Sequence, residues 1–178
     1  MDGVINEGAM KILLWVGLFA GVRVGSAQRP AVNLVTHNRI VIARPAAAVW
    51  PFIVEPNSWK MGAKLVHRSG SSGQVGEVFS AAEANAPFLV ENVELVVDRR
   101  RTIKLYQADG ALIGYATWTL DENGGKTTVG YDVYAESLIP AGSGTTADAR
   151  AEAERAERKA NIKRFDAELA ALKGLVER

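Results

Sequence analysis

Residues 162–176 read IKRFDAELAALKGLV, and the spacing of the large apolar side chains in this stretch decides the fold. These side chains recur at intervals of three, four, three and four residues: Ile162, Phe165, Leu169, Leu172 and Val176. This period places one apolar stripe along an α-helix, and the stripe must be buried against another element. We therefore predict a long helix at the C-terminal end of the chain, over residues 147–178.

The first part of this helix, residues 147–159, consists of alanine and charged residues alone. Such a sequence favours a helix but gives it no apolar side. A helix over residues 147–178 would be about 48 Å long, which is more than one sheet covers. We expect its first turns to project or bend, and residues 147–159 are a candidate surface for a protein partner.

The chain ahead of the helix has the pattern of an antiparallel sheet. Short apolar-rich segments alternate with turn residues such as Asp-Gly and Asn-Gly, which is typical of strands joined by tight turns. Strands are predicted over residues 34–43, 65–68, 75–81, 88–97, 101–107, 111–120 and 126–135. After the first strand, Pro45 opens one short helix, and Asn57 or Ser58 caps a second that runs through Met61.

Alternation within three of these strands predicts which face of the sheet is buried. The predicted inner residues are Val93, Leu95 and Val97, then Leu112, Gly114, Ala116, Trp118 and Leu120, then Val129, Tyr131 and Val133. Asn92 and Glu94 are predicted to lie on the wet face. Glu91 shares the parity of Val93, so it is expected to point inward, unless a bulge or the strand end lets it reach water.

Composition excludes several classes of protein. The 178 residues suit one domain, and 48% apolar with 23% charged residues is ordinary globular usage. The 21 basic and 20 acidic residues leave a net charge of +1, so no electrostatic footprint for nucleic acid is present. The chain has no cysteine and two histidines, which excludes thiolate chemistry and predicts no metal site and no cofactor.

The N-terminal segment predicts export. Residues 12–22, ILLWVGLFAGV, are uncharged, follow Lys11 and precede the small residues Gly25-Ser26-Ala27. A positive start, a short apolar run and a small-residue end describe a signal peptide, and the run is too short to span a bilayer. We expect a signal peptide over 1–27, with Met10 as the true start, and one mature domain over 28–178 in the periplasm or secreted. The alternative is a buried or interfacial N-terminal helix.

Two further features have competing interpretations. Arg99-Arg100-Arg101 falls between two predicted strands and is either a solvated turn or a site for a phosphate or lipid headgroup. His37 and His67 each lie in a predicted strand without a second metal ligand nearby in the sequence. We expect both histidines to be ordinary polar-face or hydrogen-bonded residues.

Four segments resemble one family. Residues 40–53, IVIARPAAAVWPFI, are similar to the first strand and helix of the SRPBCC superfamily, the START/Bet v 1-like helix-grip group that includes polyketide cyclases/dehydrases. Residues 74–77, QVGE, resemble its strand entry. Residues 115–131 resemble its "twtl…ggTxvxy" hairpin, and residues 161–177 resemble its closing helix.

The resemblance implies an α+β helix-grip fold. In that fold, a seven-stranded antiparallel sheet wraps around a long C-terminal helix, with two short helices after the first strand and a cavity between sheet and helix. Members bind apolar or amphipathic small molecules there. They share no catalytic motif, so no catalytic residue is assigned. The expected ligand-binding residues are Trp59, Phe79, Phe88, Glu91, Tyr106, Trp118, Tyr131, Phe165 and Leu169.

Three functions remain open at this point. The first is an exported protein that holds a hydrophobic small molecule or lipid, without catalysis. The second is a cyclase- or dehydratase-type enzyme in the same cavity, with Glu91 or a tyrosine transferring the proton. The third is a periplasmic interaction module in which the aromatics fill the core. A cavity below about 100 Å³ would favour this module, because ligand pockets usually measure about 300–1,000 Å³.

Export is directly testable. N-terminal sequencing of the mature protein from its own source should begin at or near Gln28, because the apolar run ends shortly before Ala27. A chain that retains Met1 or Met10 would contradict a cleaved signal peptide.

Overall fold

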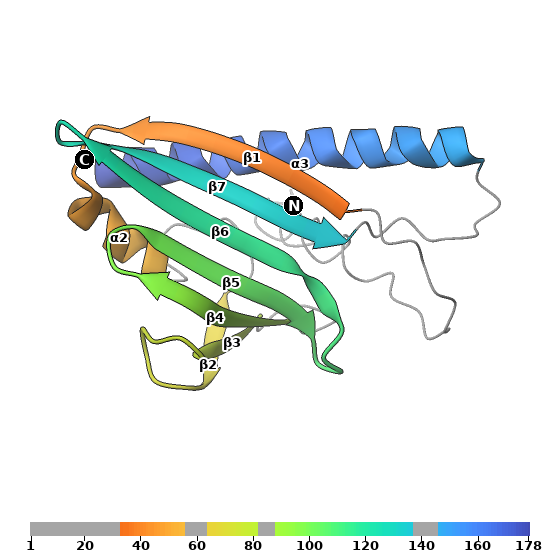
Figure 1. Ribbon diagram of the computed structural model, residues 1–178, viewed down its shortest axis with the longest axis horizontal. Coiled ribbons are helices and arrows are strands. Elements are labelled where there is room, and N and C mark those ends of the chain that lie inside the picture. The colour runs from red at the N-terminus through yellow and green to blue at the C-terminus, as the bar shows by residue number, and fades with distance from the viewer. Residues whose placement is uncertain (1–32, 56–63, 82–87, 137–145) are drawn as a thin grey trace, which may run out of the picture.

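A curved antiparallel sheet packs against one long helix, which runs alongside the first strand (Figure 1). The computed structural model describes residues 33–55, 64–81, 88–136 and 146–178, and all structural statements concern these residues. The elements in chain order are β1 (Asn33–Ile42), α2 (Ala46–Val54), β2 (Leu65–Ser69), β3 (Val78–Ala81), β4 (Phe88–Val96), β5 (Arg100–Gln107), β6 (Leu112–Asn123), β7 (Lys126–Glu136) and α3 (Ala147–Val176).

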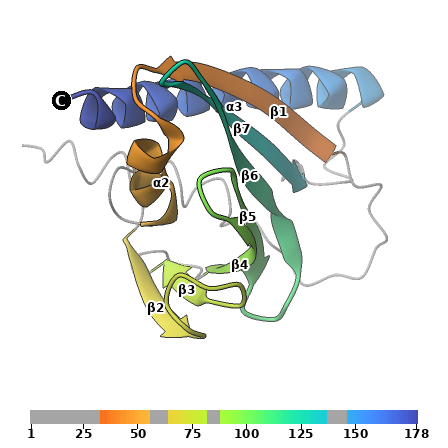
Figure 2. The same cartoon turned by 60° about the vertical axis from the view of Figure 1, so that its left-hand side comes forward.

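The sheet order follows from short connections between consecutive strands. Seven strands lie in the order β1-β7-β6-β5-β4-β3-β2, and every pair is antiparallel. Strands β2 to β7 form a meander, and β1 returns to pair with β7. Figure 2 shows the sheet curving away from α3, with α2 on the same side of the sheet as α3. The predicted α+β helix-grip fold is confirmed.

Helix α3 is continuous over 30 residues, about 45 Å. The Thr146 hydroxyl caps its first turn by accepting a hydrogen bond from the Ala149 N–H at 3.3 Å. The buried apolar stripe begins at Phe165, whereas Ile162 is 37% exposed and does not belong to it. The N-terminal part of α3 extends beyond the strands, as residues 147–159 predicted (Figure 1).

Helix α2 covers one end of the curved sheet. Pro45 precedes it, and the Ala46 N–H in its first turn donates a hydrogen bond to the Glu122 carboxylate at 2.8 Å. Its buried residues are Ala46, Val49 and Ile53, which join the main core. The second predicted short helix, with Trp59, lies outside the described residues.

An aromatic stack joins the sheet to α3. The rings of Trp118 on β6 and Tyr131 on β7 lie 4.7 Å apart and nearly parallel. Phe165 on α3 meets Tyr131 edge-on, with ring centroids 5.0 Å apart. All three side chains are at most 5% exposed, so the centre of the grip is packed with aromatic rings.

Strand β4 departs from the predicted alternation. A bulge lies between Asn92 and Glu94, because Asn92 pairs with Ile103 while Glu94 pairs with Thr102. Before the bulge, the inward residues are Phe88, Val90 and Asn92, and Asn92 is 2% exposed. The predicted inner set Val93, Leu95 and Val97 was wrong, since none is buried and Val97 is 70% exposed. One extra residue shifts the phase of a strand, and alternation alone does not locate it.

The apolar stripe of α3 can be tested with two aliphatic substitutions. Leu172→Ala, at a fully buried position, should lower the free energy of unfolding by roughly 2–5 kcal/mol. Ile162→Ala on the exposed side should cost no more than about 1 kcal/mol, because alanine also favours the helix. Denaturant titration of both variants checks the difference, and equal losses would contradict the burial of this stripe.

Candidate functional site

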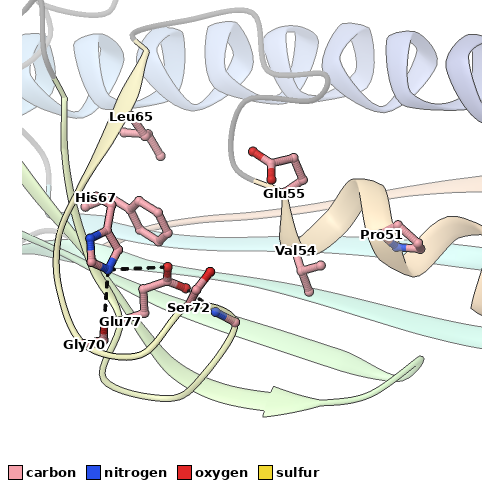
Figure 3. Close-up of a pocket in the computed structure, with 10 residues that line it drawn as sticks. Pro51, Val54, Glu55, Leu65, His67, Gly70, Ser72 and Glu77 are labelled. Carbon is pink, nitrogen blue, oxygen red and sulfur yellow. Dashed lines mark hydrogen bonds and ion pairs between the residues drawn. The ribbon is translucent and has the colours of Figure 1, made fainter.

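A pocket of about 660 Å³ lies between the end of α2 and the β2–β3 region. Figure 3 shows residues of α2 on one side of it and residues of β2 and the β2–β3 connection on the other. The lining residues are Pro51, Val54, Glu55, Leu65, His67, Gly70, Ser72, Gly73, Glu77 and Phe79. Its volume falls within the range of about 300–1,000 Å³ that is usual for small-molecule sites.

The walls of the pocket are continuous with the hydrophobic core. Leu65 on β2 is 8% exposed and Phe79 on β3 is 6% exposed, and both belong to the main core cluster. Val54 lines the pocket from the α2 side, across from Leu65 on β2 (Figure 3). A molecule in the pocket would therefore contact Leu65 and Phe79, whose positions are fixed by their packing in the core.

One buried carboxylate and one imidazole supply the polar side of the pocket. Glu77 is 4% exposed, and its Oε2 accepts hydrogen bonds from the Gly73 N–H at 2.8 Å and from Asn92 Nδ2 at 3.2 Å. His67 Nε2 lies 3.0 Å from the Gly70 carbonyl oxygen and 3.9 Å from Glu77 Oε1. Because both neighbours are acceptors, Nε2 carries the proton.

A buried arginine compensates the charge of this carboxylate. Arg101 on β5 is 3% exposed, and its Nε and Nη2 donate to Asn92 Oδ1 at 3.0 and 2.8 Å. Its Nη1 donates to the Ile53 carbonyl of α2, and its guanidinium lies over the Trp118 ring. Burial lowers the pKa of Arg101 to about 10, against the opposing effect of the Glu77 charge, so the group stays protonated at neutral pH.

The β2–β3 connection adopts its path because of glycine. Gly70 has a φ of +83°, and a Cβ there would lie 2.5 Å from the Gly76 carbonyl oxygen. Only a residue without a side chain allows the two ends of this connection to approach so closely. This tight path allows the Gly73 N–H to donate a hydrogen bond to Glu77 and the Gly70 carbonyl to accept one from His67.

The expected ligand-binding residues occupy three different environments. Phe79 lines the pocket. Phe88, Trp118, Tyr131, Phe165 and Leu169 are buried in the core cluster, so their contact with a ligand stays a prediction. Glu91 and Tyr106 lie on the outer face, in register with Lys104 and Leu89 on the paired strands. Glu91 therefore does not enter the interior, because Phe88, Val90 and Asn92 take the inward positions.

The buried polar residues beside the pocket were not predicted from the sequence as a group. Arg101 was assigned with its two neighbours to either a solvated turn or an anion site, but it is buried, whereas Arg100 is exposed and pairs with Glu94 at 3.3 Å. Asn92 was assigned to the wet face. Asn92 pairs with Ile103 and Arg101 pairs with Leu95, so the two polar side chains meet diagonally across β4 and β5. No signal for this contact was present in the sequence, because the bulge between the two positions changes the register.

The helix wall also carries a buried carboxylate. Glu168 on α3 is 3% exposed and its Oε1 lies 4.0 Å from Arg164 Nε. Burial raises the pKa of the Tyr131 hydroxyl, and the charge of Glu168 raises it further. The Tyr131 hydroxyl therefore stays protonated at physiological pH. The interior beside α3 contains the buried Glu168 carboxylate as well as apolar side chains.

A second hollow of about 690 Å³ lies near the β4–β5 turn and has a different character. Charged side chains of both signs line it, namely Asp98, Arg99, Arg100, Asp121 and Glu122. Mixed exposed charges select no single class of ligand, so the apolar pocket at α2 is the stronger candidate.

The described ranges contain neither a cluster of metal ligands nor a helix suited to span a membrane. No group of three or more His, Cys, Asp or Glu side chains there is arranged to hold a metal ion. None of the described helices is both long and apolar enough to cross a bilayer.

The comparisons with known proteins give the fold alone. No family model and no curated protein matches the sequence. The solved structure of protein SA2116 from Staphylococcus aureus, of unknown function, is similar with a TM-score of 0.66 and 9% identity, over 83% of this chain and 96% of that chain. The truncated norcoclaurine synthase from Thalictrum flavum gives 0.55 and 15% identity, over 84% of this chain and 97% of that chain.

A third similar structure is a two-domain protein. The di-domain ARO/CYC StfQ from the steffimycin biosynthetic pathway gives a TM-score of 0.62 and 14% identity, over 82% of this chain and 51% of that chain. These likenesses agree with the helix-grip fold described above. Identities this low show how the chain folds and leave its ligand and activity to the site itself.

Neighbouring arginines provide a test of the buried charge. Arg101→Met should lower the free energy of unfolding by about 3–5 kcal/mol, because it leaves the buried Glu77 carboxylate uncompensated. Arg100→Met removes an exposed ion pair and should cost no more than about 1 kcal/mol. Thermal and denaturant unfolding of the two variants measures both values, and an Arg101→Met protein as stable as the unmodified one would refute this role.

Proposed function

We propose that the protein binds a hydrophobic small molecule in the pocket between α2, β2 and β3, and that it does so as an exported protein. The observation that carries the binding proposal is the pocket of about 660 Å³ with core-supported apolar walls. Export is supported by the signal-like segment over residues 12–27.

The pocket has the two features that small-molecule sites combine. Leu65, Phe79 and Val54 offer apolar surface, and each CH₂ buried against such surface contributes about 0.8 kcal/mol. Glu77 and His67 form a small, fixed polar group at one side, which would orient the ligand. Affinity would come from the walls and orientation from this pair.

Neighbours with the same fold are consistent with this function. Two of them are named for small-molecule biosynthesis, an ARO/CYC of the steffimycin pathway and norcoclaurine synthase. The interaction-module hypothesis requires the interior to lack a cavity of useful size. Aromatic rings pack between the sheet and α3, where the ligand cavity was expected. The pocket at α2 is a different place, and its volume, several times larger than about 100 Å³, supports a ligand at that end of the molecule.

Proton transfer on the bound molecule is a second candidate function. It is favoured by one observation, the imidazole of His67 beside the buried carboxylate of Glu77 within the same pocket. An imidazole that is oriented by a hydrogen bond, here from Nε2–H to the Gly70 carbonyl, and that lies near a carboxylate is an arrangement that general acid–base catalysis uses. Glu91, expected for this role, lies on the outer face.

Uptake of a neutral fluorescent probe tests the binding proposal. N-phenyl-1-naphthylamine should gain emission with the protein, and 1-alkanols should displace it. Each added CH₂ should tighten displacement about fourfold until the pocket is full, as burial of one CH₂ predicts. Leu65→Trp, which fills the pocket, should weaken uptake at least about tenfold, whereas Val66→Trp on the exposed side of β2 should not.

The same experiment separates the alternatives. No probe uptake by the folded protein would contradict ligand binding, and so would equal uptake by both tryptophan variants. Recovery of the bound compounds, followed by mass analysis, distinguishes binding from catalysis. Unchanged compounds support binding alone, and a product whose formation is lost in His67→Ala supports proton transfer.

A further inference from the structure

The charged groups among the described residues that line the pocket are of one sign. Glu55 and Glu77 carry carboxylates, His67 carries an imidazole, and none of these described residues is lysine or arginine. A ligand that enters the pocket therefore meets negative charge at its polar side. This property bears on which chemical class of hydrophobic molecule can bind there.

Glu77 has acceptor capacity left over. Both of its donors, the Gly73 N–H and Asn92 Nδ2, bind the same oxygen, Oε2. Within the described part of the chain, Oε1 has a single polar neighbour, His67 Nε2 at 3.9 Å, which is beyond hydrogen-bond distance. A carboxylate oxygen has two lone pairs, so Oε1 can accept from a ligand.

The nearest guanidinium cannot serve a ligand. Arg101 directs Nε and Nη2 to Asn92 and Nη1 to the Ile53 carbonyl, and it does not line the pocket. Its charge stabilises the buried carboxylate from behind. The side that faces the pocket presents the acceptor, not the cation.

Among the described lining residues, no cationic group and no unused backbone N–H is shown that would bind an anionic headgroup. The Gly73 N–H is already donated to Glu77, and His67 Nε2–H is directed at the Gly70 carbonyl. A carboxylate ligand would lie beside the Glu77 carboxylate, with no lysine or arginine among the described lining residues to receive it. A protonated amine in the same place would make a charge-assisted hydrogen bond to Glu77 Oε1.

We infer that the ligand is an amphiphilic amine, with its apolar body against Leu65 and Phe79 and its ammonium group on Glu77 Oε1. This inference rests on the proposed function, because it assigns a headgroup to the molecule in that pocket. It separates the site from one that takes fatty acids, whose headgroup has the opposite charge.

Three ligands of equal chain length test the headgroup. Decylamine, 1-decanol and decanoate would each displace N-phenyl-1-naphthylamine at pH 7, below their aggregation concentrations. Decylamine should bind at least about tenfold more tightly than 1-decanol, since a charge-assisted hydrogen bond is added to the same hydrocarbon. Decanoate should bind more weakly than 1-decanol.

Glu77→Gln removes the charge but keeps an acceptor. The glutamine carbonyl can replace Oε2 as the acceptor for Gly73 and Asn92, so only the group at Oε1 changes from acceptor to donor. The advantage of decylamine over 1-decanol should fall to about threefold or less in this variant. Glu94→Gln, which alters a carboxylate bonded to Thr102 and Arg100 outside the pocket, should keep the full advantage.

The outcomes distinguish this inference from the function on which it rests. Equal or tighter binding of decanoate overturns the amine assignment and leaves the pocket as a ligand site. An amine advantage that survives Glu77→Gln overturns the role of Glu77. Failure of all three compounds and of the probe to bind overturns the proposed function itself. If Glu77→Gln does not fold, the comparison of headgroups on the unmodified protein still decides.

Discussion

The packing of Trp118, Tyr131 and Phe165 is the contact on which the rest of the structure depends. It joins β6 and β7 to α3 through rings 4.7 and 5.0 Å apart, all nearly inaccessible to solvent. Because these rings occupy the centre of the grip, α3 is fixed against the sheet at that point. The described space for a ligand then lies toward α2, β2 and β3.

A buried charge organises that end of the molecule. Arg101 is held by Asn92 on β4 and by the Ile53 carbonyl on α2, and Asn92 in turn donates to Glu77 before β3. Removing a guanidinium and a carboxylate from water is costly unless each is compensated. The hydrogen-bonded chain meets this requirement and, in the same arrangement, places one carboxylate oxygen at the pocket. Stability and ligand recognition would therefore share the same residues.

Periodicity predicted the fold because each element buries one regular face. The stripe from Phe165 to Val176 and the alternation around Trp118 and Tyr131 were both confirmed. The site was harder to predict, since it depends on irregular features. Asn92 shares the inward phase of Phe88 and Val90, which leaves Glu91 outside, and the bulge at Val93 ends this alternation. Three positive-φ glycines set the path that brings His67 to Glu77. Hydrophobic periodicity does not predict the path of the β2–β3 connection or the contact between His67 and Glu77 that this path produces.

Native mass spectrometry would test the central claim most directly. The protein would be incubated with a total small-molecule and lipid extract of its own source, desalted, and measured under non-denaturing conditions. The account predicts a stoichiometric adduct of one small, apolar molecule, which is released on unfolding and is absent from the Leu65→Trp variant. A folded protein that retains only its own mass, or an adduct that Leu65→Trp holds equally well, would contradict the account.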